Sequence, residues 1–552
     1  MKKFTQLLIV FFLCLLLSCS DKNPKADRVI LNASIWTGDE SNPSAQAMAI
    51  AGDSLLAVGS NAEIEKYKGS NTEVIDLNGA FVTPGFIDCH VHFLTGGFNL
   101  SGVQLRDAKT KEEFIHRIKA FAETIPTGTW ILGGDWDHEN WGGELPTRQW
   151  IDAVTPDHPV WITRLDGHMS LANTAALKAA GVERSVKDIA GGTIVRDATG
   201  NLTGIFKDNA TNVIDKHVPE PSPEQVDKAL QAAMKYVASF GVTSVHHMAG
   251  YMDALERARK NNNMITRIYA MYPVSQWQTL NEKIEREGRG DKWLKIGGLK
   301  GFVDGSLGSH TAAFFEPFTD APGDTGLWVN TPDQLYEWIS AADKVGLQLM
   351  IHAIGDQAIN SLLNIYERVE QENGSKDRRF RIEHAQHITP QDIPRFASLN
   401  VIPSMQPYHA IDDGRWAEKV IGPERIKTTY AFKSLFDAGA PVAFGSDWFV
   451  APPTPLEGIY AAVTRRTIDD QYPDGWVPEQ KITVEQALIA YTRNAAYASF
   501  DESLKGTLAP GKLADFVVLE KDLRIVKPED IRSVSVMQTW VGGKPVFIKS
   551  KL

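Results

Sequence analysis

The chain has 552 residues, of which 43% are hydrophobic and 23% are charged, so it can bury a large core and hold more than one structural unit. Its formal net charge of -11 and the absence of a long basic run argue against nucleic acid as a partner. The composition favours a globular enzyme.

The first residues are typical of a processing signal. Lys2 and Lys3 precede an apolar run, Leu7 to Leu17, that is short for a membrane span and fits a signal-peptide core. The next segment, Leu16-Leu17-Ser18-Cys19, resembles the lipobox of bacterial lipoproteins, whose cysteine is lipidated and becomes the new N-terminus. The alternatives are an ordinary secreted protein or an uncleaved anchor. We expect residues 1–19 to be a lipoprotein signal peptide and the mature protein to lie in the bacterial cell envelope, held at the membrane by a lipid on Cys19.

Cysteine usage limits how the mature chain is stabilised. Cys14 and Cys19 both lie in the signal segment, which leaves Cys89 alone. No disulfide can form within the mature chain, so stability must come from packing and metal. Cys89 is expected to be a small buried thiol rather than a nucleophile.

Short β-type runs occupy both ends of the chain, residues 20–80 and 501–552. Because such strands leave edges that need cover, we expect one small β-sandwich built from both ends. The runs are Arg28 to Leu31, Ala47 to Ile50, Ser54 to Val58, Glu73 to Leu77, Ala514 to Leu519, Val534 to Trp540 and Lys544 to Ile548.

Between them, in residues 81–500, strand and helix patterns alternate, which indicates a parallel sheet with crossover helices. Eight candidate strands match the number that a closed (β/α)8 TIM-like barrel requires. They are Phe81 to His92, Val242 to His247, Arg267 to Val274, Leu299 to Asp304, Leu347 to His352, Phe380 to His384, Val401 to Gln406 and Val442 to Asp447.

The gap between the first two candidate strands, about residues 95–220, is far longer than a normal crossover. It holds its own strand, Pro159 to Arg164, and an amphipathic helix through Phe114 and Ile118. We expect an inserted subdomain that lies over the barrel mouth and shapes the substrate pocket.

Metal-type ligands end several of these apolar runs. His90 and His92 are spaced i, i+2 on a strand, which places both imidazoles on one face where they can bind one metal ion. A lone His-x-His also fits a solvated strand end. Three later runs nevertheless end in His352, His384 and Asp447, and ligands at the ends of successive buried strands indicate a barrel mouth.

These motifs resemble the amidohydrolase superfamily, in particular the YtcJ-like branch that includes N-substituted formamide deformylases. The resemblance covers nearly all of the mature chain in the family's order. It is carried by Gly85 to His92, Asp166-Gly-His168, Lys300 with Asp304 to Gly308, Ile351-His352, Glu383-His384, Gly445 to Asp447 and Gly506 to Asp515.

The resemblance implies a ligand set for one or two divalent ions. His90, His92 and Asp447 would bind the more buried ion, and His352 and His384 the more exposed one. Lys300 would bridge them once carbon dioxide has carboxylated it, because a free ammonium cannot bind a cation. The alternative is a Lys300 paired with Asp304 or Glu383, with a mononuclear site remaining. Such ligands suit Zn, and also Mn, Fe or Ni.

The resemblance also implies a reaction. The ions would lower the pKa of bound water towards about 7, and Asp447 would take its proton and deliver it to the leaving nitrogen. His168 would polarise the attacked carbonyl or recognise the substrate; the alternative is an ordinary loop histidine.

Other polar residues are expected to have lesser roles. Glu383 should point to the face opposite His384 and be structural, as should His247. His310 could reach the pocket, whereas His387 and His409 fit exposed loop positions.

The expected activity is hydrolysis of a C–N bond, of amide or formamide type, in a small organic molecule. Esters, lactones or phosphoesters would suit the same chemistry. A non-catalytic binding lipoprotein is an alternative from another class, and a homodimer is one option for the assembly.

Overall fold

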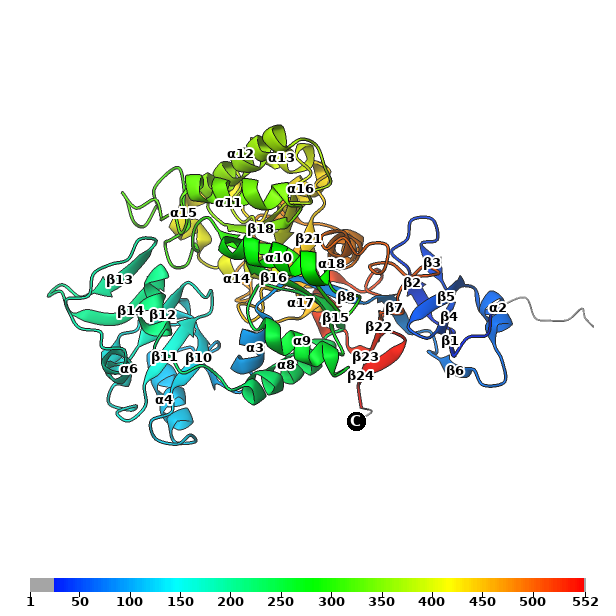
Figure 1. Cartoon of the computed structure of the whole chain (residues 1–552), viewed down its shortest axis with the longest axis horizontal. Helices are drawn as coiled ribbons and strands as arrows, with labels where there is room; N and C mark the ends of the chain where they lie inside the picture. The colour runs from blue at the N-terminus through cyan, green and yellow to red at the C-terminus, as the bar shows by residue number, and fades with distance from the viewer. Residues whose placement is uncertain (1–23, 551–552) are drawn as a thin grey trace, which may run out of the picture.

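The computed structural model describes residues 24–550, so the expected signal peptide and Cys19 lie outside the described residues. Figure 1 shows the inserted subdomain at one end of the longest axis, the barrel in the middle and a β-domain at the other end. The predicted fold class is confirmed. No helix within residues 24–550 has the length and apolar character needed to cross a bilayer.

The barrel is an eight-stranded parallel sheet in which each strand pairs with the next along the chain. It closes where the segment after the last strand meets the first strand: the Asp447 N–H donates to the His90 carbonyl at 2.7 Å, and the His92 N–H donates to the Trp448 carbonyl at 2.6 Å. The barrel strands are β8 (Phe86–Val91), β15 (Val242–His247), β16 (Arg267–Pro273), β17 (Leu294–Phe302), β18 (Gln348–Ala353), β19 (Arg381–His384), β20 (Ile402–Met405) and β21 (Ala443–Phe444).

This closure requires a glycine at position 445. A Cβ on Gly445 would lie 2.6 Å from the backbone nitrogen of His90, closer than real Cβ contacts come. Gly445 therefore lets the last strand approach the first, which brings Asp447 beside His90.

The first predicted strand, Phe81 to His92, is two strands. β7 (Phe81–Pro84) belongs to the β-domain, where it pairs with β2 and β22, and β8 begins after Gly85. Pro84 lacks the N–H that a continuing ladder would use, and a Cβ on Gly85 would collide with the Thr243 side chain. The chain thus passes from one sheet to the other at Pro84-Gly85.

Helices cover the outside of the barrel. α8 begins at a capping box formed by Ser222 and Gln225, and it buries the predicted stripe that includes Val226, Leu230 and Val237. The helices between Pro223 and Tyr497 are α8 (Pro223–Ala238), α9 (Met252–Lys260), α10 (Trp277–Glu287), α11 (Pro332–Lys344), α12 (Asp356–Asn373), α13 (Ile393–Ser398), α14 (Pro407–Asp413), α15 (Ala417–Arg425), α16 (Phe432–Asp437), α17 (Pro455–Thr464), α18 (Val484–Tyr491) and α19 (Arg493–Tyr497).

The β-domain combines both ends of the chain in two sheets, ordered β5-β4-β1-β6 and β24-β23-β22-β7-β2-β3. Ile30 and Met48 from the N-terminal part share one core with Phe516 and Trp540 from the C-terminal part. Its elements are β1 (Arg28–Leu31), β2 (Ser34–Trp36), β3 (Ser44–Ala45), β4 (Ala47–Ala51), β5 (Ser54–Gly59), α2 (Asn61–Ile64), β6 (Glu73–Asp76), β7, β22 (Phe516–Leu519), β23 (Val536–Val541) and β24 (Lys544–Ile548).

The inserted subdomain follows β8 and α3 (Phe93–Asn99) and carries a six-stranded sheet. Polar contacts hold it on the barrel: Asp166 accepts a hydrogen bond of 2.6 Å from the Ser306 hydroxyl, and Arg415 lies 3.3 Å from Asp137. Its elements are β9 (Val103–Gln104), α4 (Lys111–Ala122), β10 (Ile131–Trp136), α5 (Arg148–Ile151), β11 (Val160–Arg164), β12 (Met169–Ala172), α6 (Thr174–Ala179), β13 (Gly192–Arg196), β14 (Leu202–Asp208) and α7 (Asn212–Asp215).

Candidate metal centre and active site

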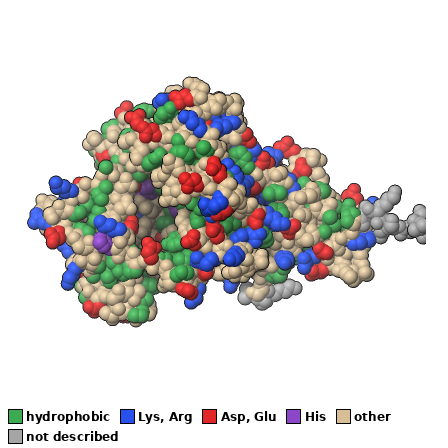
Figure 2. Space-filling model, in the orientation of Figure 1, with side chains coloured by type: hydrophobic (Ala, Val, Ile, Leu, Met, Phe, Trp, Pro, Cys, Tyr) green, Lys and Arg blue, Asp and Glu red, His purple; other side chains and the backbone are tan. Residues whose placement is uncertain are grey.

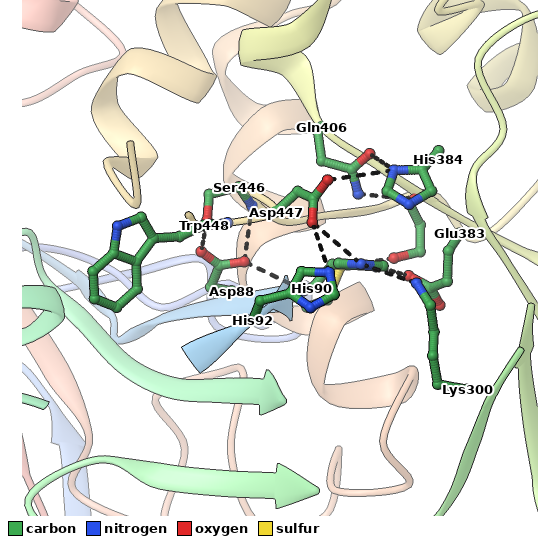
Figure 3. Close-up of polar contacts among 12 residues, drawn as sticks. Asp88, His90, His92, Lys300, Glu383, His384, Gln406, Ser446, Asp447 and Trp448 are labelled. Atoms are coloured by element: carbon green, nitrogen blue, oxygen red, sulfur yellow. Dashed lines mark hydrogen bonds and ion pairs between the residues drawn. The ribbon is translucent and has the colours of Figure 1, made fainter. Parts of the chain in front are cut away.

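One end of the barrel gathers the residues that the sequence predicts as ligands. Figure 3 shows the side chains of His90, His92, His384 and Lys300 around that of Asp447. Each comes from or directly follows a barrel strand: His90 from β8, His92 from the position between β8 and α3, Lys300 from β17, His352 from β18, His384 from β19 and Asp447 from the segment after β21.

Asp447 lies at the centre of the cluster. Its Oδ1 is 3.4 Å from Nε2 of His90 and 3.4 Å from Nε2 of His92, and its Oδ2 is 3.9 Å from Nδ1 of His384. Burial alone would raise the pKa of Asp447, but the neighbouring imidazoles hold it well below its usual value. The carboxyl group is therefore ionised.

The environment of Asp447 fits a bound cation. Its Oδ1 is buried and has no hydrogen-bond partner among the described residues. A buried anionic oxygen without a partner is unfavourable unless a cation lies beside it. The surrounding imidazoles are ligands for Zn and related divalent ions.

Hydrogen bonds orient three of the histidines. Nδ1 of His90 donates to Oε2 of Glu383 at 2.5 Å, Nε2 of His352 donates to the Gly305 carbonyl at 2.9 Å, and Nδ1 of His384 donates to Oε1 of Gln406 at 2.9 Å. In each ring the other nitrogen is left as the acceptor. Metal-binding histidines are oriented in this way by carboxylates, amides and carbonyls behind them.

Glu383 lies inside the barrel, so the prediction that it points to the opposite face is wrong. Strand alternation assumes an extended backbone, but His384 has φ +73° and leaves that geometry at the end of β19. Arg381 donates to Glu383 at 2.7 Å, and all of these groups are buried. Burial would raise the pKa of Glu383, but Arg381 and His90 lower it to about 2.

Lys300 lies beside His90, with 3.3 Å between Nζ and Nε2. Burial lowers the pKa of Lys300 to about 8. No hydrogen bond or ion pair joins it to Asp304 or Glu383 among the described residues. Asp304 instead accepts the backbone N–H groups of Ala313 and Gly355, each at 2.8 Å, and so organises the loop after β17.

His168 reaches the mouth from the inserted subdomain. Its Nδ1 donates to Oδ1 of Asp208 at 2.6 Å, and the ring centroids of His168 and His352 are 5.0 Å apart. Burial would lower the pKa of His168, but the Asp208 carboxylate outweighs burial and raises it. Sequence reasoning missed Asp208, because a partner 40 residues away on another strand leaves no periodic signal.

Cys89 and His247 have structural surroundings. The Cys89 thiol lies 3.2 Å from the Ser404 hydroxyl, and burial raises its pKa to about 12. His247 accepts from the Phe93 N–H at 3.2 Å and donates to the Gly250 carbonyl at 3.1 Å. Both ring nitrogens of His247 are thus used by the backbone.

Three other histidines differ from expectation. His310 pairs with Asp320 at 3.0 Å and does not line the cavity at the barrel mouth. His387 and His409 are buried rather than exposed. The reason is local: α14, which carries His409, starts directly after β20 and folds over the mouth, and Nδ1 of His387 bonds the Thr429 hydroxyl at 2.9 Å.

A cavity lies between the barrel mouth and the inserted subdomain. Figure 2 shows the hollow, with histidine visible inside it. The space is about 670 Å³ when the part open to solvent is counted. Part of its lining is apolar and is formed by Leu165, Phe302 and Trp416. His168 and the candidate metal ligands form the part of the lining where a reaction could take place.

Comparison with known proteins agrees with this geometry. The family described as the Amidohydrolase family matches residues 73–547. The chain belongs to the amidohydrolase family. The amidohydrolase family is metal-dependent, and the Asp447 cluster contains the candidate metal-binding groups of this chain.

The matches to three relatives extend over most of this chain and most of each relative. The amidohydrolase is 42% identical to protein LONG AFTER FAR-RED 3 of Arabidopsis thaliana, over 95% of this chain and 92% of that protein. It is 32% identical to YtcJ of Bacillus subtilis (strain 168), over 94% of this chain and 98% of the other. It is 27% identical to the N-substituted formamide deformylase of Arthrobacter pascens, over 94% and 97%.

Among solved structures, an uncharacterized metal-dependent hydrolase from Pyrococcus horikoshii is similar to this amidohydrolase. The two share 28% sequence identity with a TM-score of 0.74, over 91% of this chain and 99% of that one.

Proposed function

We propose that this amidohydrolase cleaves a C–N bond, of amide or N-substituted formamide type, in a small organic molecule. The observation that carries the proposal is the ionised, buried Asp447 at the centre of a histidine cluster that opens onto a small cavity. The similarity to a formamide deformylase over nearly the whole chain supports the choice of bond.

We assign the metal ligands from the residues at the mouth. His90, His92 and Asp447 would hold one ion, and His352 and His384 a second. A bound divalent ion would lower the pKa of a water molecule and polarise a carbonyl oxygen.

Asp447 is the proposed proton carrier. Its ionised carboxylate can take a proton from the attacking water and deliver it to the leaving nitrogen, which would otherwise depart as an unstable anion. His168, held by Asp208, is placed to donate from Nε2 to the carbonyl oxygen as negative charge develops there. The inserted subdomain covers the mouth and limits the access of bulk water.

Lys300 takes part, in this proposal, as a carbamate. Its neutral amine would form an N–C bond to carbon dioxide and release one proton to solvent, which would leave an anionic carbamate whose oxygens could ligate a divalent ion. The burial that lowers the pKa of Lys300 to about 8 supports this role, because it makes the neutral amine accessible. Lys300→Ala should then lose the second ion, and added carboxylic acids should partly restore binding.

We also propose that the protein is anchored in the bacterial envelope by a lipid on Cys19. The support is the sequence Leu16-Leu17-Ser18-Cys19 after an apolar run. The substrate would then be a small molecule encountered outside the cytoplasm.

The proposed reaction is tested by a hydrolysis screen of the purified protein against N-substituted formamides, amides, esters, lactones and phosphoesters. We expect turnover of a formamide or amide, its loss on chelation and its recovery with Zn²⁺ or Mn²⁺. Full activity in a demonstrably metal-free preparation, or turnover confined to esters or phosphoesters, would contradict the proposal.

A further inference from the structure

His409 lies beside the metal centre, although its sequence position suggested a loop. It is carried by α14, and its ring is parallel to that of His384, with 6.5 Å between centroids and 9° between planes. One ligand atom from each of His384, His409 and Asp447 lies within 4.8 Å of the others. All three side chains line the cavity.

The ring of His409 lacks a partner for one nitrogen. Its Nε2 is buried and makes no hydrogen bond to any residue in the described part of the chain. His387 shares that property, but its ring packs against Phe314 and its other nitrogen bonds a threonine. An unpartnered nitrogen alone is therefore not a sign of metal binding, whereas one within 4.8 Å of a carboxylate oxygen and of a nitrogen of a second imidazole is.

The two carboxylate oxygens of Asp447 lie nearest to different histidines. Oδ1 lies 3.4 Å from Nε2 of His90 and of His92, whereas Oδ2 lies 3.9 Å from the His384 ring at Nδ1, the nitrogen that also donates to Gln406. One ligand atom of the His384 ring nevertheless lies within 4.8 Å of those of Asp447 and His409. A carboxylate placed in this way can bind two ions at once, one through each oxygen.

We propose that His409 is a metal ligand, and that His384, His409 and Asp447 form a position for a divalent cation next to the one at His90, His92 and Asp447. The family resemblance assigned the second ion to His352 and His384; His409 adds a ligand that it did not include. The inference rests on the metal dependence of the protein and not on the bond that it cleaves.

The test is a metal titration that uses no substrate. Full-length wild-type protein, His409→Ala, His409→Gln and the matched control His387→Ala are stripped of metal, and Co²⁺ is titrated against a chromophoric chelator. We expect His409→Ala and His409→Gln to lose one Co²⁺ ion or to bind it at least about tenfold more weakly. Removal of a residue that only hydrogen-bonds to a metal ligand already weakens metal affinity by about that factor. The visible absorption of the Co²⁺ protein should change as well, while His387→Ala should match wild type.

Two results would overturn the proposal. One is unchanged stoichiometry and affinity in both His409 variants; the other is an equal loss in His387→Ala, which would show a general effect of altering a buried histidine. Circular dichroism of the metal-free proteins separates loss of fold from loss of a ligand, and His409→Gln preserves most of the packing. Failure of the substrate screen would leave these results unaffected.

Discussion

Glu383 and His90 are joined by a hydrogen bond of 2.5 Å between Oε2 and Nδ1, and both side chains are fully buried. Arg381 donates to both oxygens of the same carboxylate, with 2.7 Å between its Nε and Oε1 of Glu383 and 3.0 Å between its Nη2 and Oε2. The interior of the barrel thus fixes the ring of His90, and Nε2 is the nitrogen left for the metal. Glu383 positions a ligand without being one.

Glu383→Gln should weaken metal binding by about 10- to 100-fold, because an amide is a poorer acceptor for the His90 N–H. It should also lower the free energy of unfolding by about 3–5 kcal/mol, since the buried Arg381 loses its carboxylate. Metal titration and denaturant unfolding measure the two effects. Glu367→Gln, at a half-exposed pair with Arg395, is the control and should change stability by about 1 kcal/mol or less. Equal behaviour of the two variants would refute the role of Glu383.

His168→Ala should reduce kcat by about 100- to 1,000-fold, the usual loss when a donor to a developing oxyanion is removed. KM should change less, because the donor acts mainly on the transition state. Asp208→Asn should give a smaller loss, since the amide oxygen still accepts from Nδ1 but the charge is gone. The control is His310→Ala, a surface histidine paired with Asp320. Turnover of His168→Ala within twofold of wild type would exclude His168 as the donor.

Cys19→Ala should abolish lipidation, so the protein should no longer partition with membranes. The mass of the mature N-terminus and membrane fractionation measure the effect. Cys14→Ala, within the same apolar run, is the matched control and should be processed normally. Unchanged processing of Cys19→Ala would show that the lipobox interpretation is wrong.

The sequence predicts the barrel and also predicts that the candidate histidine and aspartate ligands lie close together. These ligands end apolar runs, and the carboxyl ends of parallel strands lie at the same end of a barrel. The eight predicted runs correspond to barrel strands, although the first was drawn too long. Pro84 signals the break between β7 and β8, because proline has no N–H to continue a strand ladder. The apolar pattern continues across Pro84-Gly85, however, and therefore predicts a single strand.

The residues around the ligands were harder to predict. His384 and Asp447 both have positive φ, +73° and +60°, so counting alternate faces fails at the strand ends that carry the chemistry. That failure misplaced Glu383. Asp208 and His409 come to the site through tertiary contacts of the inserted subdomain and of α14, for which one sequence gives no local signal.

The central claim is that Asp447 moves protons at a metal-dependent site, and Asp447→Asn tests it most directly. The amide keeps an oxygen that can weakly ligate a metal ion but cannot take the proton of water. Turnover and bound metal should be measured on the same preparation. We expect turnover to fall by at least about a hundredfold while the histidines retain metal and substrate binding changes less. Near-normal turnover with metal retained would contradict the account and assign the proton transfer to another base.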